Sequence, residues 1–491
     1  GIVLLTVVIL FLCVGILTPK EMLEGFSNKG MITVGLLFLV SEGVRQSGAL
    51  GYMIKKLLPN GKTTVFKAQL RMLPPIAFIS AFLNNTPVVV IFAPIIKRWA
   101  ESVHIPATKF LIPLSYVTIL GGVCTLIGTS TNLVIHGMVL DAGYAGFSMF
   151  ELGKVGILIA LVGMIYIFLF SKRLLPESRK DNLAEEEEEG RGNLHRVEAV
   201  IGARFPGINK TLREFNFTRH YGAIVKEVRS GGECFTRDLD KVRLQEGDTL
   251  ILWADETFVP TWGESSVFIM LANGSDNEPQ PMSRRKRWFT LGLLIFMIVG
   301  ATIGELPLMK ELFPDIRLDM FFFVCITTVI MAWTKIFPPK KYTKYISWDI
   351  LITIACAFAI SKAMVNSGFA DLIARNIIGI SKSIGPYAIL AILFIITNIF
   401  TELITNNAAA ALSFPIALSV ATQLGVNPTP FFVVICMAAS ASFTTPIGYQ
   451  TNLIVQGIGG YKFMDFVKIG LPLNIIAFLI SVFVIPMIWN F

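Results

Sequence analysis

Two short polar stretches recur inside apolar sequence, and their residue types suit the binding of small ions. Residues 125–133 read TLIGTSTNL and residues 445–453 read TPIGYQTNL, at an offset of 320 residues. Each stretch places glycine, hydroxyl and amide groups where an unbroken membrane helix would otherwise be expected. Irregular backbone at membrane depth is tolerated only where it is buried in protein or lines a solvated cavity. Matching breaks in two halves of a chain therefore point to a transport site.

Two further polar tips accompany these loops. Residues 84–86 (Asn-Asn-Thr) and 405–407 (Thr-Asn-Asn) each begin ten residues before a proline, Pro94 or Pro415, at an offset of 321. We interpret both as tips of re-entrant hairpins. In the first hairpin we expect arms of roughly 12–15 residues, too short to span a bilayer core of about 30 Å.

These four segments predict one anion site flanked by two sodium sites. Helix N-termini with amide and hydroxyl donors suit an anion, whereas amide, hydroxyl and backbone carbonyl oxygens suit a cation. The candidate substrate-binding residues are Asn84, Asn85, Thr86, Thr405, Asn406, Asn407, Thr129, Ser130, Tyr449 and Gln450. The candidate ligands are Asn85, Gly128, Thr129 and Asn132 for the first sodium, and Asn406, Gly448, Thr451 and Asn452 for the second. Any single Asn or Thr can instead be a hydrogen-bonding partner between helices, worth about 1 kcal/mol or less.

Three ionisable residues, Glu42, Arg45 and Glu402, are expected in or near the bilayer core, where charged groups are functional candidates by default. Glu42 and Arg45 are three residues apart and can simply pair on one helix. Glu402 precedes Thr405 by three residues and is a candidate proton carrier, which leaves proton coupling open.

The composition indicates a polytopic α-helical membrane protein, because the chain as a whole is too apolar for a soluble protein. Of 491 residues, 54% are hydrophobic and 15% charged, and the mean hydropathy is +0.66. The net charge of +8 comes from basic residues in short loops, where it reports membrane orientation and not a nucleic-acid partner. The six cysteines and four histidines lack metal-site spacing, and no catalytic motif appears, so we expect no enzyme. Because Gly1 opens inside an apolar run, we infer that the natural N-terminus lies upstream.

Apolar segments predict the membrane spans. We expect them at residues 1–18, 31–56, 108–139, 153–173, 288–304, 318–337, 347–366, 430–458 and 467–489, with 108–139 and 430–458 broken by the polar loops. Residues 41–48 also match residues 361–368 at an offset of 320. An odd number of crossings separates equivalent segments, which predicts two inverted repeats, residues 1–173 and 288–491. We expect the first repeat to lack its first helix.

Residues 174–287 change in composition and predict a small α/β cytosolic domain with linkers. A glutamate run at residues 185–189 is typical of a solvated linker. Strands are expected at residues 197–203, 221–228, 248–254 and 267–272, with a short helix at 210–215. Basic residues before and after the domain place it, and the mouth of the first hairpin, on the cytosolic side.

At these residues the chain resembles the divalent anion:sodium symporter (DASS) family. The similarity covers both membrane halves and includes residues 24–28, both hairpin tips and both Gly-x-x-Thr-Asn loops. Members characteristically carry Ser-Asn-Thr at the tips and often Gly-Thr-Pro-Pro-Asn in the loops. This chain departs at both places, so it looks more like the sulfate-transporter branch than the dicarboxylate carriers.

The inserted domain carries a second resemblance. Residues 206–214, 221–225 and 244–250 are similar to the C-terminal ligand-binding module of regulator-of-potassium-conductance (RCK) proteins. That resemblance implies a dimerising β-α fold, which either senses a small ligand such as a nucleotide or serves only dimerisation.

Together these patterns predict a homodimeric, multi-pass transporter of the plasma membrane that imports a small divalent oxyanion, sulfate first, with sodium. Dicarboxylate, arsenite or silicate substrates, proton coupling, and a ligand-gated anion channel remain as alternatives. A dianion entering a cell held at −100 mV costs about 4.6 kcal/mol, so two monovalent cations only cancel this cost and a third makes entry favourable. The expected partners are the anion, sodium, membrane lipid and a second copy of the chain.

Overall fold

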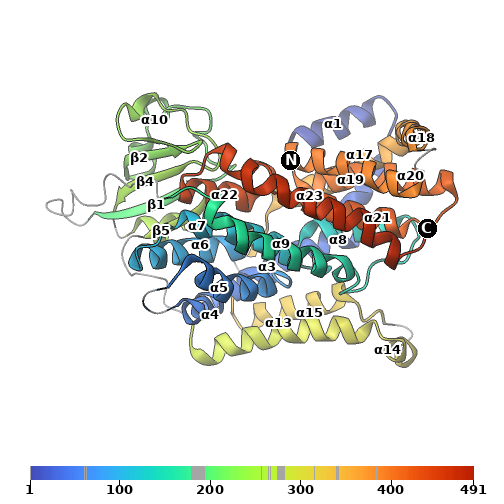
Figure 1. The fold of residues 1–491 in the computed structure, drawn as a ribbon, viewed down its shortest axis with the longest axis horizontal. Coiled ribbons are helices and arrows are strands. Elements are labelled where there is room, and N and C mark those ends of the chain that lie inside the picture. The colour runs from blue at the N-terminus through green and yellow to red at the C-terminus, as the bar shows by residue number, and fades with distance from the viewer. Residues whose placement is uncertain are drawn as a thin grey trace.

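The structure, a computed structural model, describes residues 2–59, 61, 63–177, 194–255, 257–263, 265, 267–273, 282–313, 316–338, 342–381 and 385–491. The glutamate linker predicted at residues 185–189 lies outside these ranges. The described chain forms a large helical bundle with one five-stranded sheet at one end (Figure 1). We call residues 194–273, which carry this sheet, the inserted domain.

Helices of the first half precede the inserted domain, and those of the second half follow it. The first half contains α1 (Ile2–Cys13), α2 (Pro19–Glu24), α3 (Lys29–Gln46), α4 (Ala49–Leu57), α5 (Val65–Ser80), α6 (Asn85–Ser102), α7 (Thr108–Gly122), α8 (Ser130–Asp141) and α9 (Gly153–Leu174). The second half contains α13 (Arg284–Gly304), α14 (Pro307–Leu312), α15 (Met320–Trp333), α16 (Tyr342–Tyr345), α17 (Trp348–Asn366), α18 (Phe369–Ser381), α19 (Pro386–Leu403), α20 (Asn406–Leu424), α21 (Thr429–Ser440), α22 (Gln450–Gly459) and α23 (Phe463–Ile488).

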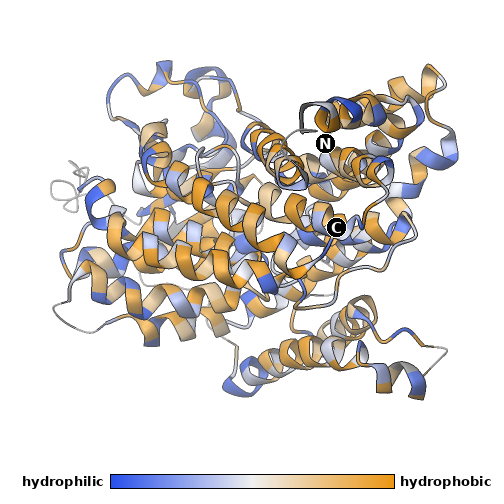
Figure 2. Cartoon of the chain, turned by 45° about the vertical axis from the view of Figure 1, so that its right-hand side comes forward, coloured by the Kyte–Doolittle hydropathy of each residue, from blue (hydrophilic) through white to orange (hydrophobic). Residues whose placement is uncertain are grey.

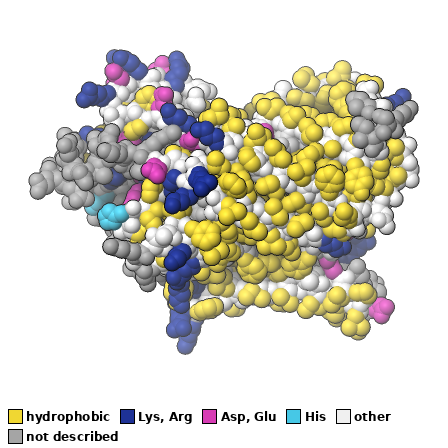
Figure 3. Space-filling view, in the orientation of Figure 1, with side chains coloured by type: hydrophobic (Ala, Val, Ile, Leu, Met, Phe, Trp, Pro, Cys, Tyr) yellow, Lys and Arg dark blue, Asp and Glu magenta, His cyan; other side chains and the backbone are white. Residues whose placement is uncertain are grey.

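The bundle has the composition of a membrane domain. Within the described residues, seven helical segments are long and apolar enough to cross a membrane: Pro19–Gln46, Gly153–Leu174, Arg284–Gly304, Trp348–Asn366, Pro386–Leu403, Asn406–Leu424 and Phe463–Ile488. Figure 2 shows hydrophobic residues along most of the helices. On the face seen in Figure 3, hydrophobic side chains cover the bundle, while Lys and Arg gather mainly at the end that carries the inserted domain. Both observations support a multi-pass membrane protein.

Both breaks predicted inside apolar spans are confirmed. Residues 123–129 separate α7 from α8, and residues 441–449 separate α21 from α22, without helix in either gap. The order α5, α6, α7, α8, α9 recurs as α19, α20, α21, α22, α23 at offsets close to 320 residues. The two polar tips also lie where predicted, at the start of α6 after α5 and at the start of α20 after α19.

Several predicted segments are wrong in extent. The single helix expected at residues 31–56 is two helices, because Gly48 adopts φ 71°, a left-handed conformation that ends α3 and is easily reached only by glycine. Gly368, its match in the second half, has φ 72° and separates α17 from α18. The span expected at 1–18 stops at Cys13, shortly before Gly15 at φ 77°.

The arms of the first hairpin are also longer than the expected 12–15 residues. Helix α5 has 16 residues and α6 has 18. Both continue past the apolar stretch through basic residues, Lys67 and Arg71 on α5 and Lys97 and Arg98 on α6. A count restricted to apolar residues therefore underestimates these helices.

The inserted domain is an antiparallel sheet in the order β3-β2-β4-β1-β5. Its strands are β1 (His195–Ile201), β2 (Ile224–Ser230), β3 (Glu233–Phe235), β4 (Thr249–Ala254) and β5 (Phe268–Asn273), and its short helices are α10 (Leu212–Phe215), α11 (Phe217–Tyr221) and α12 (Phe258–Trp262). All four predicted strands exist, shifted by one to three residues, but β3 was not predicted. The helix expected at 210–215 begins only at Leu212, because Thr211 and Glu214 form a capping box at its start.

The inserted domain packs directly on the bundle. Val200 of β1 and Met270 of β5 belong to the same buried cluster as the helices. At Gly457 on α22, a Cβ atom would lie 2.3 Å from Thr249 Oγ1 and 2.6 Å from the carbonyl oxygen of Gly247, so only glycine permits this approach. The domain thus contacts α22, a helix that begins at one of the two polar loops.

Candidate functional site

The two hairpin tips start their helices in the same way. Asn85 opens α6 and Asn406 opens α20, and both side chains are buried. Ser80 Oγ lies 2.8 Å from Asn85 Oδ1 and 3.0 Å from the carbonyl oxygen of Thr118. Thr401 Oγ1 lies 2.9 Å from Asn406 Oδ1 and 2.6 Å from the carbonyl oxygen of Ala439. These two networks correspond at an offset of 321 residues in every member.

Each hydroxyl has one hydrogen, so it cannot donate to both neighbouring oxygens. If Thr401 donates its hydrogen to the Ala439 carbonyl, its oxygen can only accept a hydrogen bond from Asn406, so the amide nitrogen of Asn406 must face Thr401. The nitrogen and oxygen of an amide are assigned from such hydrogen-bond networks. In this orientation the amide oxygen of Asn406 takes the position of its buried Nδ2 atom. In the opposite orientation that Nδ2 atom has no hydrogen-bond partner among the described residues. At Asn85 no such exchange is needed, because Nδ2 donates to the Tyr449 hydroxyl at 2.8 Å and Oδ1 accepts from Ser80. Asn406 thereby presents an oxygen toward the site, whereas Asn85 bonds to the opposite loop through its amide nitrogen.

The two polar loops also share one internal network. The Gly128 N–H donates to Thr125 Oγ1 and the Gly448 N–H to Thr445 Oγ1, both at 3.1 Å. Asn132 Nδ2 donates to the carbonyl of Thr125 at 2.9 Å, and Asn452 Nδ2 donates to that of Thr445 at 3.1 Å. These bonds hold the unwound backbone in place.

Glycine is required at the centre of both loops. A Cβ atom at Gly128 would lie 2.6 Å from the carbonyl oxygen of Gly122 and 2.8 Å from that of Ala81. At Gly448 it would lie 2.3 Å from Ser442 Oγ. Oxygen atoms therefore converge on both glycines, as expected for residues that help hold a cation.

Each tip bonds to the loop of the opposite half. Thr86 Oγ1 donates to Gln450 Oε1 at 3.3 Å, and Ser130 Oγ donates to Asn407 Oδ1 at 3.1 Å. With the Asn85–Tyr449 contact, these bonds join residues more than 270 positions apart in the chain. Six of the ten candidate substrate residues are thus directly linked across the two halves.

Two other candidates take a different place. Asn84 and Thr405 are the N-cap residues of α6 and α20, but neither side chain makes a capping hydrogen bond. Thr405 is exposed, whereas Asn84 is half-buried. Sequence reasoning placed them on the same tips as Asn85 and Asn406, and the structure confirms that position without giving their side chains a partner in the site.

The two halves differ at Glu402, which occupies the position of Ala81 in the first half. Its Oε1 accepts from the Thr444 N–H at 2.8 Å and from Asn474 Nδ2 at 3.0 Å. Its Oε2 accepts from the Thr445 N–H at 2.9 Å and from Thr445 Oγ1 at 2.6 Å. The carboxylate therefore closes the second loop with four donors, whereas the first loop uses the backbone carbonyl of Ala81.

Glu42 and Arg45, in contrast, form their own pair. Arg45 donates from Nε to Glu42 Oε2 at 2.7 Å and from Nη2 to Oε1 at 2.6 Å, one turn apart on α3. The expectation that they pair on one helix is confirmed.

Sequence reasoning missed several residues of the site. Ser80 and Thr401 each lie five residues before a tip asparagine, so the repeat alignment contains the signal for both. Ser115 on α7 contacts Asn452, and Asn474 on α23 contacts Thr444 in the second loop, but neither belongs to a repeated motif. No local pattern marks these two.

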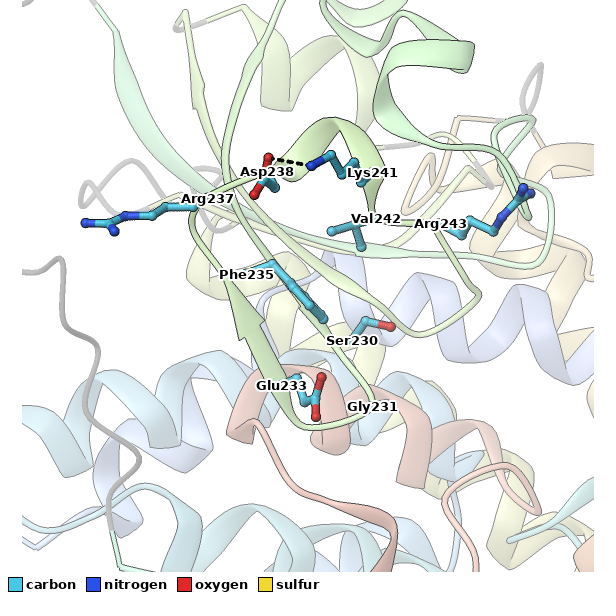
Figure 4. A pocket seen from close by; sticks show the side chains of 9 residues that line it. All are labelled: Ser230, Gly231, Glu233, Phe235, Arg237, Asp238, Lys241, Val242 and Arg243. Carbon is cyan, nitrogen blue, oxygen red and sulfur yellow. Dashed lines mark ion pairs between the residues drawn. The ribbon is translucent and has the colours of Figure 1, made fainter.

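The inserted domain has an open cavity of about 480 Å³ between β2, β3 and the turn that follows. Figure 4 shows the side chains of Arg237 and Arg243 pointing away from its centre, on opposite sides. Lys241 Nζ pairs with Asp238 Oδ1 at 3.1 Å, which partly neutralises its charge. These cations do not converge on one point, so the geometry gives no support to a nucleotide there, and the ligand of the domain stays a prediction.

Amide, hydroxyl and carbonyl groups held between two halves of an apolar helical bundle define a membrane transporter. Comparison with known proteins gives the family: the citrate transporter family model matches residues 1–322 and 312–491, and this chain belongs to that family. The chain is accordingly a transporter and not an enzyme.

Individual relatives agree with this class. An uncharacterized transporter (sll0640) of Synechocystis sp. is 29% identical, over 99% of this chain and 93% of the relative. Sodium/sulfate cotransporter 1 of Chlamydomonas reinhardtii is 22% identical, over 96% and 85%. The Na(+)/citrate cotransporter of Rattus norvegicus is 32% identical, over 32% and 28%. These names support the DASS resemblance, while the RCK resemblance is left as a prediction.

Proposed function

We propose that this transporter imports a small divalent oxyanion, sulfate first, together with sodium ions by alternating access. The observation that carries the proposal is the matched pair of buried tip asparagines, each contacted by a hydroxyl of its own half, Ser80 or Thr401. Relatives named sodium/sulfate cotransporters support the same cation and anion.

Neutral oxygen atoms make the cation sites. Asn132 Oδ1 is fully buried and has no hydrogen-bond partner among the described residues, so a cation would satisfy it. In the first site it joins Asn85, Gly128 and Thr129, and in the second Asn406 joins Gly448, Thr451 and Asn452. Alkali cations prefer such hard oxygen ligands, and none of these eight groups can carry a proton in place of sodium.

The anion would bind between the sites, where the tips meet the opposite loops. Thr86, Ser130, Tyr449 and Gln450 supply hydroxyl and amide donors there, and the helices α8 and α22 begin at this point, so their N–H groups face the same region. Donors without charge suit a fully ionised oxyanion whose charge is balanced by the accompanying cations.

Alternating access follows from inverted repeats. We infer that the halves α5–α9 and α19–α23 are inverted, so that one hairpin opens to each side of the membrane. In this arrangement the inserted domain and the first hairpin face the cytosol, and the protein lies in the plasma membrane as a homodimer.

Uptake of radiolabelled sulfate into proteoliposomes tests the proposal. We expect uptake only with an inward sodium gradient, inhibition by excess unlabelled sulfate, and weaker inhibition by citrate or succinate. Uptake that is driven equally well by a pH gradient alone, or unitary conductance in planar bilayers, would replace this proposal with a proton-coupled carrier or a channel.

A further inference from the structure

Ser115, in the middle of α7, touches the first turn of α22 from the opposite half of the chain. Its Oγ lies 2.8 Å from Thr451 Oγ1 and 2.7 Å from Asn452 Oδ1. All three side chains are fully buried, at 0% exposure. Since Thr451 and Asn452 are proposed ligands of the second sodium, Ser115 lies directly behind that site.

The available hydrogens fix the direction of these bonds. Asn452 Nδ2 donates to the carbonyls of Ser442 at 2.9 Å and Thr445 at 3.1 Å, so its Oδ1 faces Ser115 and can only accept. The single hydrogen of Ser115 therefore goes to Asn452, and the hydrogen of Thr451 goes to Ser115. Thr451 Oγ1 then keeps its lone pairs, and among the described residues no other hydrogen bond occupies them.

The proposed first sodium site has no equivalent serine behind it. The position equivalent to Ser115 is Cys436 on α21, whose thiol is a weak donor. Asn132 Oδ1, the counterpart of Asn452 Oδ1, has no partner among the described residues. The halves thus differ in which buried oxygen is left for a cation: the amide oxygen of Asn132 in the first and the hydroxyl oxygen of Thr451 in the second.

We propose that Ser115 is a positioning residue of the second sodium site. By accepting the hydrogen of Thr451, it turns the lone pairs of that hydroxyl toward the cation. The inference rests on the proposed function, because it assumes a cation beside Thr451. Without the Ser115 hydroxyl, Thr451 can rotate its hydrogen into the site, and Asn452 Oδ1 loses its donor. Sodium affinity should fall, whereas the anion contacts of Thr86 and Gln450 should persist.

Ser115→Ala in the purified full-length protein tests the proposal. Thermal stabilisation by sodium without anion reports cation binding independently of transport. We expect the sodium concentration for half-maximal stabilisation to rise about tenfold, equivalent to about 1.4 kcal/mol. The same shift should appear in proteoliposome uptake, while the half-saturating sulfate concentration at saturating sodium stays within about twofold. Ser115→Thr keeps a hydroxyl and should restore the sodium requirement.

Ser481→Ala is the matched control, because Ser481 is another fully buried hydroxyl, on α23, without a described partner. It should leave the sodium requirement unchanged. An unchanged requirement in Ser115→Ala, or an equal shift in Ser481→Ala, overturns the proposal. If Ser115→Ala does not fold, Ser115→Cys takes its place, because cysteine is the residue found at the equivalent position 436. The proposal then requires Ser115→Cys to raise the sodium concentration for half-maximal stabilisation. Wild-type protein that responds to sodium in neither assay would refute the proposed function itself.

Discussion

Lys97 of α6 and Glu198 of β1 form an ion pair, Nζ to Oε1 2.7 Å, between the helical bundle and the inserted domain. Both side chains are nearly enclosed, at 10% and 16% exposure. Although burial raises the pKa of Glu198, the Lys97 ammonium together with Arg229 and Arg196 more than offsets this effect, and the resulting pKa lies below its usual value. Because α6 also carries Asn85, the domain is held by the same helix that starts at the site.

Breaking this pair should loosen the domain. Lys97→Met leaves the Glu198 carboxylate with Arg196, 3.6 Å away, and the field of Arg229. We therefore expect a loss of about 1–3 kcal/mol, below the range for a fully buried pair. Hydrogen exchange along β1 and limited proteolysis measure the effect. Lys241→Met removes a similar but exposed pair with Asp238 and should change neither. The charge-swapped double variant Lys97→Glu with Glu198→Lys should recover part of the lost protection of β1. No recovery would contradict a stabilising role of the ion pair.

Removing either tip asparagine should weaken sodium binding. Asn85→Ala and Asn406→Ala each delete a proposed cation oxygen, so the sodium concentration for half-maximal sulfate uptake should rise about tenfold or more. Proteoliposome uptake at varied sodium measures this. Asn427→Ala, at the exposed turn before α21, is the control. Equal sodium dependence in wild type and both variants would exclude these residues as ligands.

Glu402→Gln tests proton coupling. All four donors around this carboxylate point at its oxygens, and a proton there would displace one of them. In the Gln variant an NH₂ group replaces one carboxylate oxygen and faces the two donors that this oxygen accepted from. We therefore expect the uptake rate to fall several-fold, while uptake remains driven by sodium. Uptake is measured with sodium and pH gradients imposed separately. If wild-type uptake follows the pH gradient at full rate without sodium and Glu402→Gln abolishes it, the proton model is correct.

Asp248 makes the stability of the inserted domain depend on pH. Burial raises the pKa of this carboxyl to about 6. The folded state then holds a proton that the unfolded state, with a pKa near 4, has lost, so stability should fall as pH rises from about 4 to about 6 and level off above about 7. Asp248→Asn should remove this fall and stabilise the domain by up to about 2 kcal/mol at pH 8. Hydrogen exchange along β4 at pH 5 and pH 8 measures it, and an identical pH dependence in the variant would contradict the assignment.

Inverted halves should place equivalent turns on opposite sides of the membrane. His104 follows α6, and Leu424 ends α20 at nearly the same position of the second half; both are exposed. In a cysteine-free background, an impermeant thiol reagent should label Leu424→Cys in intact cells and His104→Cys only after permeabilisation. Labelling of both positions from the same side would refute the inversion.

The features that can be predicted from the sequence are local or repeated. Apolar composition specifies membrane helices, because lipid-facing segments must be apolar over a bilayer's thickness. The repeated Gly-x-x-Thr-Asn loops and the tip asparagines locate the breaks, because unwound backbone needs these polar groups nearby. Hydropathy does not specify where these helices end, since Gly48 and Gly15 end helices through their backbone conformation and not through any change in hydropathy.

The tertiary structure alone decided which of these groups meet. Tyr449 reaches Asn85 across 364 residues, Ser115 reaches Asn452 across 337, and Lys97 reaches Glu198 across 101. No periodicity or spacing encodes such pairs, because they depend on how whole helices pack against one another. The repeat also made the two halves look equivalent, whereas Glu402 in place of Ala81, and Ser115 in place of Cys436, become meaningful only when their neighbours are known. Hydrogen-bond direction, which decides which oxygen is left for a cation, follows from those neighbours.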